Sequence, residues 1–308
     1  SSFDNSTERT IYYTFNKSSD EFVGKIVTGA AAQKPIFNEG LLYIPTPRAN
    51  EFVSIDLNNT SQNLNDDIIN IYRTANGLPA NGKGTLSATV DKSNDLWVGS
   101  DNGLRILRNA SQAIKEGNVR LEPIIIEQKG IGEELFRDSA VLQIEADSGN
   151  QKWVSVEQGG VFYLNASGEN QIHHFTKENS PLPTNSVTDI KVDEKTGKVY
   201  FVTFDGIVVY QGDVANVNKN FGDVLVYPNP VVYANFKGNV RIKGLAEKTN
   251  IRITDAAGNL VHQAVTRGGY YEWDLTNRGK RVASGIYFVL MTNDDATDKA
   301  TAKIAVVN

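Results

Sequence analysis

The sequence predicts an all-β fold, with β-propeller blades followed by an immunoglobulin-like β-sandwich. The first observation is a motif that recurs about every 50 residues, because repeats of that period typically build propellers or solenoids. The second is that each repeat alternates apolar and polar residues in short runs. The third is that this alternation continues from residue 223 to the end without the repeat. At 308 residues the chain has room for two domains.

The repeat is clearest in NGLPANGKGTLSATVDKSNDLWVGSDNGLRIL (76–107) and NSPLPTNSVTDIKVDEKTGKVYFVTFDGIVVY (179–210). A third copy lies at 135–165, and a fainter one at 24–56 places Tyr43 in the aromatic position. In the three clear copies an Asp precedes an aromatic residue and a Gly follows it, each about six residues away. These blade signature residues are Asp91, Trp97 and Gly103, then Asp147, Trp153 and Gly160, then Asp193, Tyr200 and Gly206.

Each copy predicts one propeller blade of four short antiparallel strands. LSATV, DLWVG and GLRIL give three strands of one blade, and runs such as IINIYR and IHHFT give a more variable fourth strand. The segments DKSND (91–95) and DSGNQ (147–151) supply the residues that tight hairpins need. The Trp of a blade is expected to pack between neighbouring blades.

The register of the repeats leaves unmatched strands at both ends of this region. The copy at 186–211 has three strands, and RTIYYTFN (9–16) has the pattern of a blade's outermost strand. Either 9–16 completes the last blade and closes a four-bladed ring, or the chain is the C-terminal part of a longer protein with a larger ring. In both cases residues 1–211 are predicted to form propeller blades.

The remainder of the chain predicts a linker and a second domain. Residues 212–222, GDVANVNKNFG, are polar and lack the repeat, so they predict the linker. Beyond them, VRIKGL, NIRITDAAGNLVHQAV, YYEWDL, SGIYFVLMT and AKIAVVN alternate apolar and polar residues between Gly, Asn and Asp turns. This spacing predicts an antiparallel β-sandwich at 223–308.

The repeat unit resembles the two-component-regulator propeller repeat. The resemblance rests on the LPxN segments that begin at Leu78 and Leu182, on the Asp turn, on the aromatic strand and on the Gly-led strand. Members of that family usually build rings of more than four blades. The resemblance therefore favours the larger ring, of which this chain would be the C-terminal part.

The tail resembles the C-terminal sorting domain of the type IX secretion system of the Bacteroidetes. Its motifs follow in the expected order, and they are VYPNP (226–230), ITDAAGNLV (253–261), WDL (273–275), VASGIYFV (282–289) and KIAVV (303–307). The resemblance covers the whole of the predicted second domain, and it implies export of the protein.

Propeller blades of this kind followed by this tail resemble the cell-surface components of the type IX attachment complex. The resemblance implies a location on the outer-membrane surface, a PorU-like sortase as partner and binding of anionic lipopolysaccharide. The function expected is a non-enzymatic scaffold that supports sortase-mediated cargo processing and anchoring. Two alternatives stay open: a secreted carbohydrate-binding or hydrolytic cargo with a cleavable tail, and the periplasmic sensor domain of a hybrid two-component system.

The composition excludes several other classes. A net charge of −5, with Lys and Arg scattered, offers no basic face to nucleic acid. No run approaches the roughly 18 apolar residues of a membrane helix. The absence of Cys excludes disulfides, thiol catalysis and Cys-ligated metals. The first residues, SSFDNSTERT, have neither an initiator Met nor a signal-peptide pattern, so they leave the compartment open.

Few residues suggest chemistry, and no catalytic residue, metal or cofactor is expected. His173 and His174 are neighbours on a strand, so they point to opposite faces and cannot share a metal ion. DKSND is spaced like the start of a calcium loop but lacks its Gly and distal Glu, so a hairpin turn is expected. The carboxylate pairs Asp66–Asp67 and Asp294–Asp295 lie in polar loops and are expected to be solvated.

Aromatic and basic residues of the tail are weak candidates for binding a sugar. Aromatic side chains stack on sugars, but Trp273 is expected in the core, and a solvated rim is the plainer interpretation of the basic residues. The candidate ligand-binding residues are Tyr270, Tyr271, Arg267, Arg278 and Lys280. Separately, DSA at 138–140 resembles the short acceptor for O-glycosylation of exported proteins in this phylum, which implies a sugar on Ser139.

Overall fold

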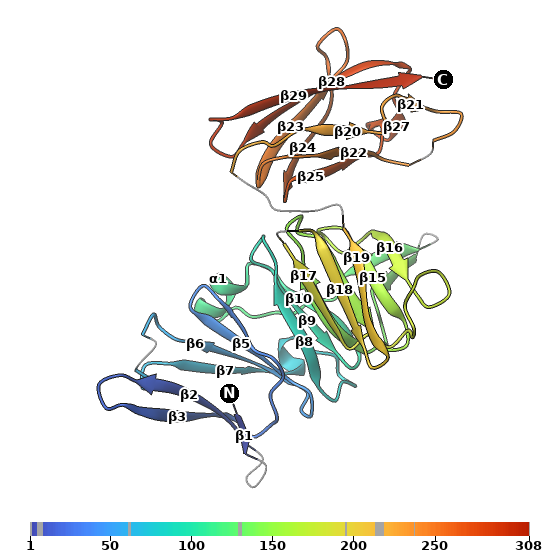
Figure 1. The fold of residues 1–308 in the computed structure, drawn as a ribbon. Helices are drawn as coiled ribbons and strands as arrows, with labels where there is room; N and C mark the ends of the chain where they lie inside the picture. The colour runs from blue at the N-terminus through green and yellow to red at the C-terminus, as the bar shows by residue number, and fades with distance from the viewer. Residues whose placement is uncertain are drawn as a thin grey trace. The chain divides into compact units, whose positions relative to one another are not determined.

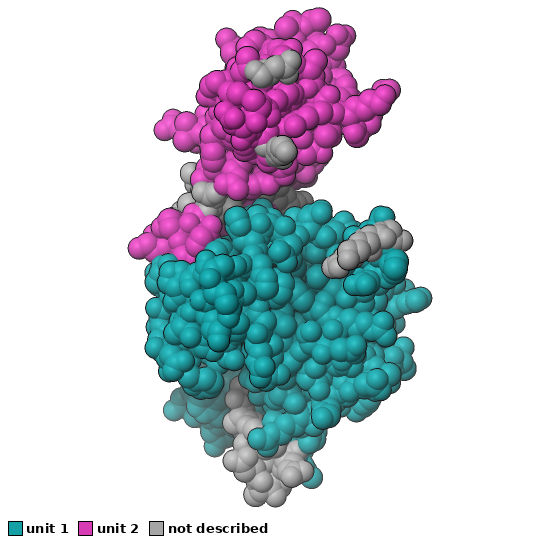
Figure 2. Space-filling view, turned by 90° about the vertical axis from the view of Figure 1, so that its right-hand side faces the viewer, with its two compact units in different colours: residues 1–146, 151–191, 200–209 teal, residues 147–150, 192–199, 210–308 magenta. Residues whose placement is uncertain are grey.

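The structure, a computed structural model, describes residues 2–4, 9–60, 63–128, 131–194, 196–212, 219–236 and 238–307. The chain divides into two compact units, which Figure 2 draws in different colours. The first comprises residues 1–146, 151–191 and 200–209, and the second comprises residues 147–150, 192–199 and 210–308. In both units almost all of the regular secondary structure is β-strand, as the predicted all-β class requires.

Four sheets follow one another along the chain, and in each the strands are paired in sequence order (Figure 1). This is the arrangement of propeller blades, so the predicted blades are confirmed. Their strands are β4 (Ile36–Asn38), β5 (Leu41–Thr46), β6 (Glu51–Asp56) and β7 (Ile68–Tyr72); β8 (Thr85–Val90), β9 (Leu96–Ser100) and β10 (Gly103–Leu107); β13 (Val141–Ala146), β14 (Lys152–Val156), β15 (Gly160–Leu164) and β16 (Gln171–Phe175); and β17 (Asp189–Asp193), β18 (Lys198–Thr203) and β19 (Gly206–Gln211).

Alternation along the strands places the cores between neighbouring blades. In β9, Leu96 and Val98 pack with Tyr43 of the first blade. Trp97 points to the opposite face and packs with Val154 of the third blade. Successive residues of a strand point to opposite faces, so one apolar strand can serve two interfaces. A blade is therefore stable only against its neighbours.

The segment at 9–16 differs from its prediction as a lone outer strand. Strand β2 (Arg9–Asn16) lies between β1 (Ser2–Asp4) and β3 (Glu21–Thr28) in a three-stranded sheet. The turn at 17–20 lets the chain fold back, and the rings of Phe15 and Phe22 meet with centroids 5.2 Å apart. Because both edges of β2 are paired, the alternative in which 9–16 completes the last blade and closes a four-bladed ring is wrong. The larger ring stays a prediction.

The runs IINIYR and IHHFT form the fourth strands β7 and β16, as predicted. Among the described residues, the second blade has three strands, and only an isolated bridge between Ile106 and Glu122 extends it. The residues that follow this blade form a short helix and two strands that were not predicted from the sequence. They are α1 (Ala110–Lys115), β11 (Ile125–Gln128) and β12 (Ile131–Glu134), while a 3-10 turn, η1 (Thr74–Asn76), precedes the blade.

The second unit contains a β-sandwich, which confirms the prediction for the tail. One sheet has the order β20-β22-β25, the other has the order β21-β29-β28-β23-β24, and a small hairpin joins β26 to β27. The strands are β20 (Leu225–Tyr227), β21 (Val231–Val232), β22 (Val240–Lys243), β23 (Lys248–Thr254), β24 (Leu260–Arg267), β25 (Tyr270–Trp273), β26 (Thr276–Asn277), β27 (Lys280–Arg281), β28 (Gly285–Asn293) and β29 (Lys299–Val307).

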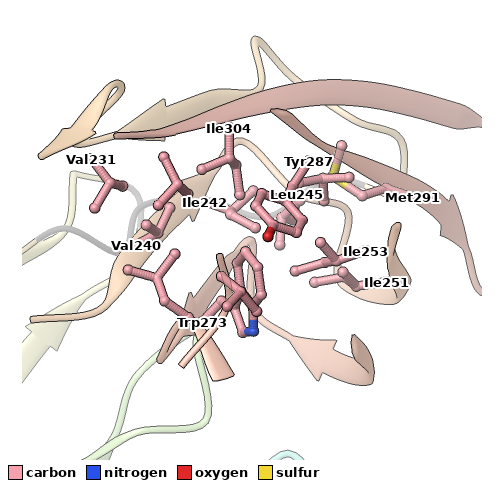
Figure 3. Packing of buried hydrophobic residues seen from close by; sticks show 14 residues of the cluster. Val231, Val240, Ile242, Leu245, Ile251, Ile253, Trp273, Tyr287, Met291 and Ile304 are labelled. Carbon is pink, nitrogen blue, oxygen red and sulfur yellow. The ribbon is translucent and has the colours of Figure 1, made fainter. Parts of the chain in front are cut away.

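The core of the sandwich takes side chains from both sheets (Figure 3). Ile242 and Trp273 come from the smaller sheet, and Ile251, Met291 and Ile304 come from the larger one. Trp273 is fully buried, as the sequence predicted. Its ring lies edge-on to Tyr287, with the centroids 5.6 Å apart. Truncation of so large a buried side chain typically costs about 3 to 5 kcal/mol.

Part of the predicted linker is bonded to the sandwich. The backbone N–H of Phe221 donates to the carboxylate of Asp298 over 2.9 Å. The N–H of Gly222 donates to the carbonyl of Gly244, also over 2.9 Å. Residues 213–218 of the linker lie outside the described residues. The hydrogen bonds place residues 219–222 with the second unit.

Candidate functional site

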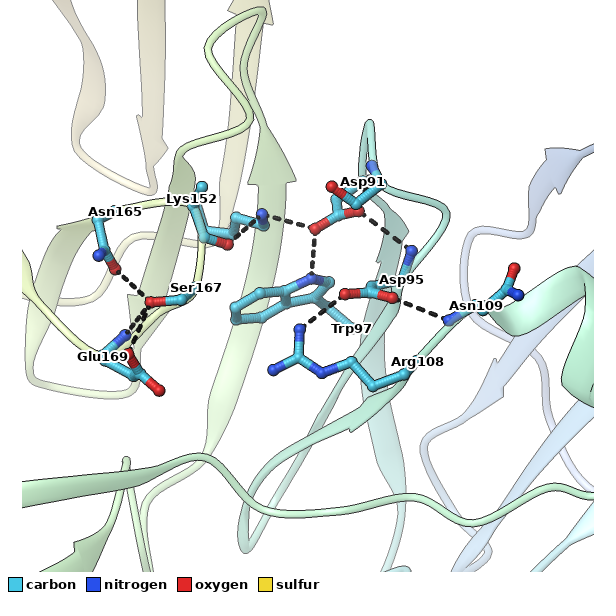
Figure 4. A network of polar contacts seen from close by, with 11 residues as sticks. Asp91, Asp95, Trp97, Arg108, Asn109, Lys152, Asn165, Ser167 and Glu169 are labelled. Atoms are coloured by element: carbon cyan, nitrogen blue, oxygen red, sulfur yellow. Dashed lines mark hydrogen bonds and ion pairs between the residues drawn. The ribbon is translucent and has the colours of Figure 1, made fainter. Parts of the chain in front are cut away.

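One carboxylate oxygen of Asp91, in the second blade, accepts hydrogen bonds from both Trp97 and Lys152 (Figure 4). Asp91 Oδ2 lies 3.1 Å from the indole Nε1 of Trp97 and 2.7 Å from Lys152 Nζ, which belongs to the third blade. The ammonium also donates to the carbonyl of Ala166 over 2.8 Å and lies 4.6 Å from the centroid of the Trp97 ring. The signature Asp and Trp thus act together as one inter-blade contact.

The other oxygen of Asp91 closes the DKSND hairpin. Asp91 Oδ1 accepts the backbone N–H of Ser93 at 2.8 Å and that of Asp95 at 3.1 Å. Asp95 itself is paired with Arg108, whose Nη1 lies 2.7 Å from Oδ2. Because protein donors use these carboxylates, the segment is a hairpin turn and not a calcium loop, as the sequence predicted.

The aromatic residue of each repeat lies in the second strand of its blade. The Trp153 ring stacks on Tyr163 with the centroids 3.9 Å apart, and it lies 5.7 Å from Phe201 of the next blade. Tyr200 is only half-buried. Asp147 is buried after β13, and Asp193 ends β17, where its carboxylate accepts the hydroxyl of Thr196 over 2.6 Å.

Each signature Gly begins the third strand of its blade, where φ is positive. The values are +104° at Gly103, +79° at Gly160 and +143° at Gly206. Side chains are strained in that part of φ/ψ space. At Gly160 space is restricted as well, since a Cβ would lie 2.1 Å from the carbonyl oxygen of Phe175. The signature therefore marks backbone geometry as much as side-chain packing.

The inner strands β8, β13 and β17, together with residues 33–36, line a cavity of about 430 Å³ in the first unit. Some of its charged residues have partners within the cavity: Lys191 Nζ lies 2.7 Å from Glu145, and the amide of Gln143 donates to Asp189 over 2.5 Å. None of the described residues that line it is aromatic, so it offers no stacking surface to a sugar. Its polar lining suits a small polar ligand or a peptide loop.

Of the tail aromatics, Tyr270 is 8% exposed and its hydroxyl donates to Glu272. Tyr271 packs partly against the sandwich core, and its hydroxyl lies 2.5 Å from Nε2 of His262. Burial raises the pKa of Tyr271 to about 12. Both hydroxyls thus have partners within the sandwich. Their role in binding a sugar stays a prediction.

The basic candidates do not form one cluster with these tyrosines. Lys280 lies in β27 and is exposed, and exposed Arg278 precedes it with a φ of +50°. The neighbouring Arg281 lies over the ring of Tyr233, 4.0 Å from its centroid. The side chain of Arg267 lies outside the described residues. Binding of a polysaccharide by Arg278 and Lys280 stays a prediction.

Ser139, the candidate for O-glycosylation, lies in the turn before β13. Its side chain is half-buried, and its hydroxyl donates to the carbonyl of Arg137 over a long 3.4 Å. Its own carbonyl accepts the N–H of Gly103 at 2.8 Å. Glycosylation of Ser139 stays a prediction.

Two features of the site region were not found from the sequence. Lys152 was not singled out, because a Lys in a strand is usually exposed. Its burial could be expected only if its ion pair with Asp91 of another blade were known. Asp67 was expected to be solvated, and that expectation is wrong. Its side chain is buried, and neither carboxylate oxygen has a hydrogen-bond partner among the described residues. Burial accordingly raises the pKa of Asp67.

His173 and His174 lie on opposite faces of β16, as expected. The His174 ring stacks on Phe162 and the His173 ring lies over Tyr163, with centroids 3.9 Å and 6.3 Å apart. Among the described residues, no group of three or more His, Asp or Glu could hold a metal ion. In the same residues no helix is long and apolar enough to cross a membrane.

Comparison with known families concerns the second unit. Residues 225–307 match the family described as the secretion system C-terminal sorting domain. The match contains all of the sandwich strands, and it supports the resemblance inferred from VYPNP, WDL and KIAVV. A domain of this kind indicates an exported protein. No curated protein sequence matches the chain.

A solved structure from the type IX secretion system matches almost the whole chain. It is PorZ of Porphyromonas gingivalis, described as an essential bacterial surface component of the type IX secretion system. This chain has the fold of part of PorZ. The TM-score is 0.64 at 22% identity, and the match covers 99% of this chain and 44% of PorZ. The chain thus spans less than half of PorZ, and at this identity the likeness shows the fold alone.

Two further solved structures match with lower TM-scores. The extracellular domain of BT4673 from B. thetaiotaomicron, assigned to a one-component system, matches at 14% identity with a TM-score of 0.38, over 90% of this chain and 36% of its own. Sqt1 of Saccharomyces cerevisiae matches at 15% identity with a TM-score of 0.45, over 87% of this chain and 67% of its own.

Proposed function

We propose that this protein is a non-enzymatic component of type IX secretion at the outer-membrane surface. One observation carries the proposal: a chain that has the fold of PorZ over 99% of its length also matches a sorting domain at 225–307. The role we assign is scaffolding, in which the protein supports sortase-mediated processing of cargo. Its proposed partners are a PorU-like sortase and the anionic lipopolysaccharide to which cargo is anchored.

The geometry of the blades supports a scaffold. Neighbouring blades are joined by buried contacts such as Lys152 with Asp91, so the loops between strands are carried on a rigid base. In the inner cavity, Lys191 and Glu145 neutralise each other. The proposal keeps the division into blades at 1–211, a linker at 212–222 and a sorting-domain-like sandwich at 223–308.

Deletion of the gene in the native bacterium tests the scaffold role. We expect cargo proteins to accumulate in the periplasm with their sorting domains uncut, and complementation with the intact gene to restore surface anchoring. Normal anchoring of cargo in the deletion strain would overturn the proposal. An inactivated cargo gene is the matched control, because it removes one surface protein without affecting the others.

The sorting-domain match also favours a second function, that of a secreted cargo whose tail is removed. The two functions predict different forms of the mature protein. A scaffold retains residues 223–308, whereas a cargo ends within 212–222 and carries a lipopolysaccharide adduct. The intact mass of the endogenous protein from cell envelopes, with sequencing of its C-terminus, distinguishes them.

A further inference from the structure

The larger sheet of the sandwich presents an outer face of aliphatic and cationic side chains. Residues of β23, β28 and β29 alternate between the core and this face, as Ile251 and Met291 point inward while Arg252 and Leu290 point outward. We call this surface the outer sheet face. The outward-pointing residues that define it are Arg252, Val265, Ile286, Leu290, Lys299 and Lys303.

The charge of this face differs from that of the whole protein. Asp and Glu outnumber Lys and Arg by 36 to 31 in the chain, yet β23, β24, β28 and β29 contain no Asp or Glu. Arg252, Lys299 and Lys303 are exposed, and within the described part of the chain none of them has an ion-pair partner. Their charges are therefore available to a carboxylate from outside the protein.

The face also exposes aliphatic area and is hollowed at its centre. Val265, Ile286 and Leu290 are 62%, 44% and 43% exposed. A hollow of about 430 Å³ is lined in part by Arg252, Leu290 and Lys299. The strand register places Arg252 beside Leu290, and Thr292 beside Lys299, so the two cations flank an apolar centre. Such a centre with a charged rim is the usual anatomy of a protein interface.

We propose that the outer sheet face is a docking surface for an acidic protein, whose carboxylates pair with Arg252, Lys299 and Lys303 around Leu290. Charge complementarity favours an acidic partner. A protein is favoured over a polysaccharide or a membrane, because sugars and lipid interfaces are usually met by exposed aromatic side chains. Phe288 is the aromatic residue of these strands that points outward; it is half-buried and lies 5.8 Å from Lys303 Nζ. The inference goes beyond the function proposed above and does not depend on it.

The first experiment detects contacts between lysine amines of this protein and carboxylates of a bound partner. Cell envelopes that contain the full-length protein are treated with a water-soluble carbodiimide, and the crosslinked peptides are identified by mass spectrometry. We expect Lys299 and Lys303 to be joined to Asp or Glu residues of one other protein, and Lys280, exposed on β27, to give no such link. The absence of links at Lys299 and Lys303, or equal linking at Lys280, would overturn the proposal.

The second experiment measures affinity for the protein that the crosslinks identify. The double variant Arg252→Glu, Lys299→Glu should weaken binding by about tenfold or more, with a smaller difference at high salt. The matched variant Arg278→Glu, Lys280→Glu should bind within about twofold of the wild type. Thermal unfolding checks that each variant folds, and Arg252→Gln, Lys299→Gln replaces the first if it does not.

Two further probes separate the other classes of partner. Vesicles containing phosphatidylglycerol and purified lipopolysaccharide from the same cells are tested with the same variants. If either binds the wild type and loses binding in the Arg252→Glu, Lys299→Glu variant, while the crosslinked protein does not, the outer sheet face recognises lipid or glycan and the proposal is wrong. Unchanged binding of the protein in that variant would also overturn it.

Discussion

Lys152 Nζ lies 2.7 Å from Asp91 Oδ2, and the two side chains, from adjacent blades, are 0% and 1% exposed. Both charged groups are shielded from water, which costs free energy of solvation. The ion pair is stable only because further hydrogen bonds to both groups offset that cost. Trp97 donates to the same carboxylate oxygen, and the carbonyl of Ala166 accepts from the ammonium. The contact fixes the position of the third blade relative to the second.

Lys152→Met should destabilise the blades strongly. It leaves the Asp91 carboxylate buried without its cation, which typically costs about 3 to 5 kcal/mol. The double variant Asp91→Asn, Lys152→Met removes both charges and should recover part of the loss. Lys191→Met is the control, because its ion pair with Glu145 is largely exposed on the lysine side and should contribute at most about 1 kcal/mol. Urea unfolding followed by Trp fluorescence measures these differences.

Gly160→Ala should destabilise the third blade more than Gly117→Ala. The two glycines have similar φ values, +79° and +72°, so both substitutions incur about 1 to 2 kcal/mol of backbone strain. A Cβ at Gly117 would meet no atom within 4 Å, whereas one at Gly160 would lie 2.1 Å from the carbonyl oxygen of Phe175. The clash forces β15 and β16 apart. Equal unfolding midpoints in urea for the two variants would contradict this account.

The repeat predicted the blades because its residues are constrained by local geometry. Trp97 must alternate with Leu96 and Val98 to face a different neighbour, and Gly160 must adopt a positive φ. Such constraints recur in each copy, so a single sequence reveals them. The sandwich was predicted for the same reason, since Trp273 falls in the strand pattern of its core.

The features that were missed depend on pairing between distant segments. Strand β2 was recognised as a strand, but its partner β3 carries the exposed residues Phe22 and Ile26 and has no repeat signature. Lys152 and Asp91 are far apart in sequence and meet only when two blades pack. The outer sheet face likewise becomes visible only when the register of β23, β28 and β29 is known.

His262 should make the sandwich less stable in mild acid. Burial lowers its pKa below 6.5, although the carboxylate of Asp274 opposes this shift. The unfolded chain therefore binds a proton more readily than the folded one, so stability is complete above a pH of about 6.5 and falls as the pH decreases through that value. We expect His262→Gln to flatten this dependence between about pH 7.5 and pH 5.5. Thermal unfolding of both proteins at the two pH values is the measurement, and parallel midpoints would contradict the role of His262.

Asp67→Asn should stabilise the first unit at neutral pH. Asp67 is 7% exposed, and among the described residues no donor meets its carboxylate. Burial raises its pKa above 3.8, while Lys25 opposes the shift, so the folded state binds the proton more tightly than the unfolded state. Stability is thus lost as the pH rises through the folded pKa, and a neutral amide should recover about 1 kcal/mol at pH 7.

The neighbouring carboxylate provides the control for that substitution. Asp66 accepts the hydroxyl of Thr60 at 2.8 Å, so Asp66→Asn removes a satisfied acceptor and should give no gain in stability. The advantage of Asp67→Asn should also shrink near about pH 4, because the raised pKa favours the neutral carboxyl in the folded state as the pH falls. Urea unfolding of the wild type and both variants at the two pH values measures this. A gain that is the same at both, or is shared by Asp66→Asn, would mean that the buried charge of Asp67 is not its cause.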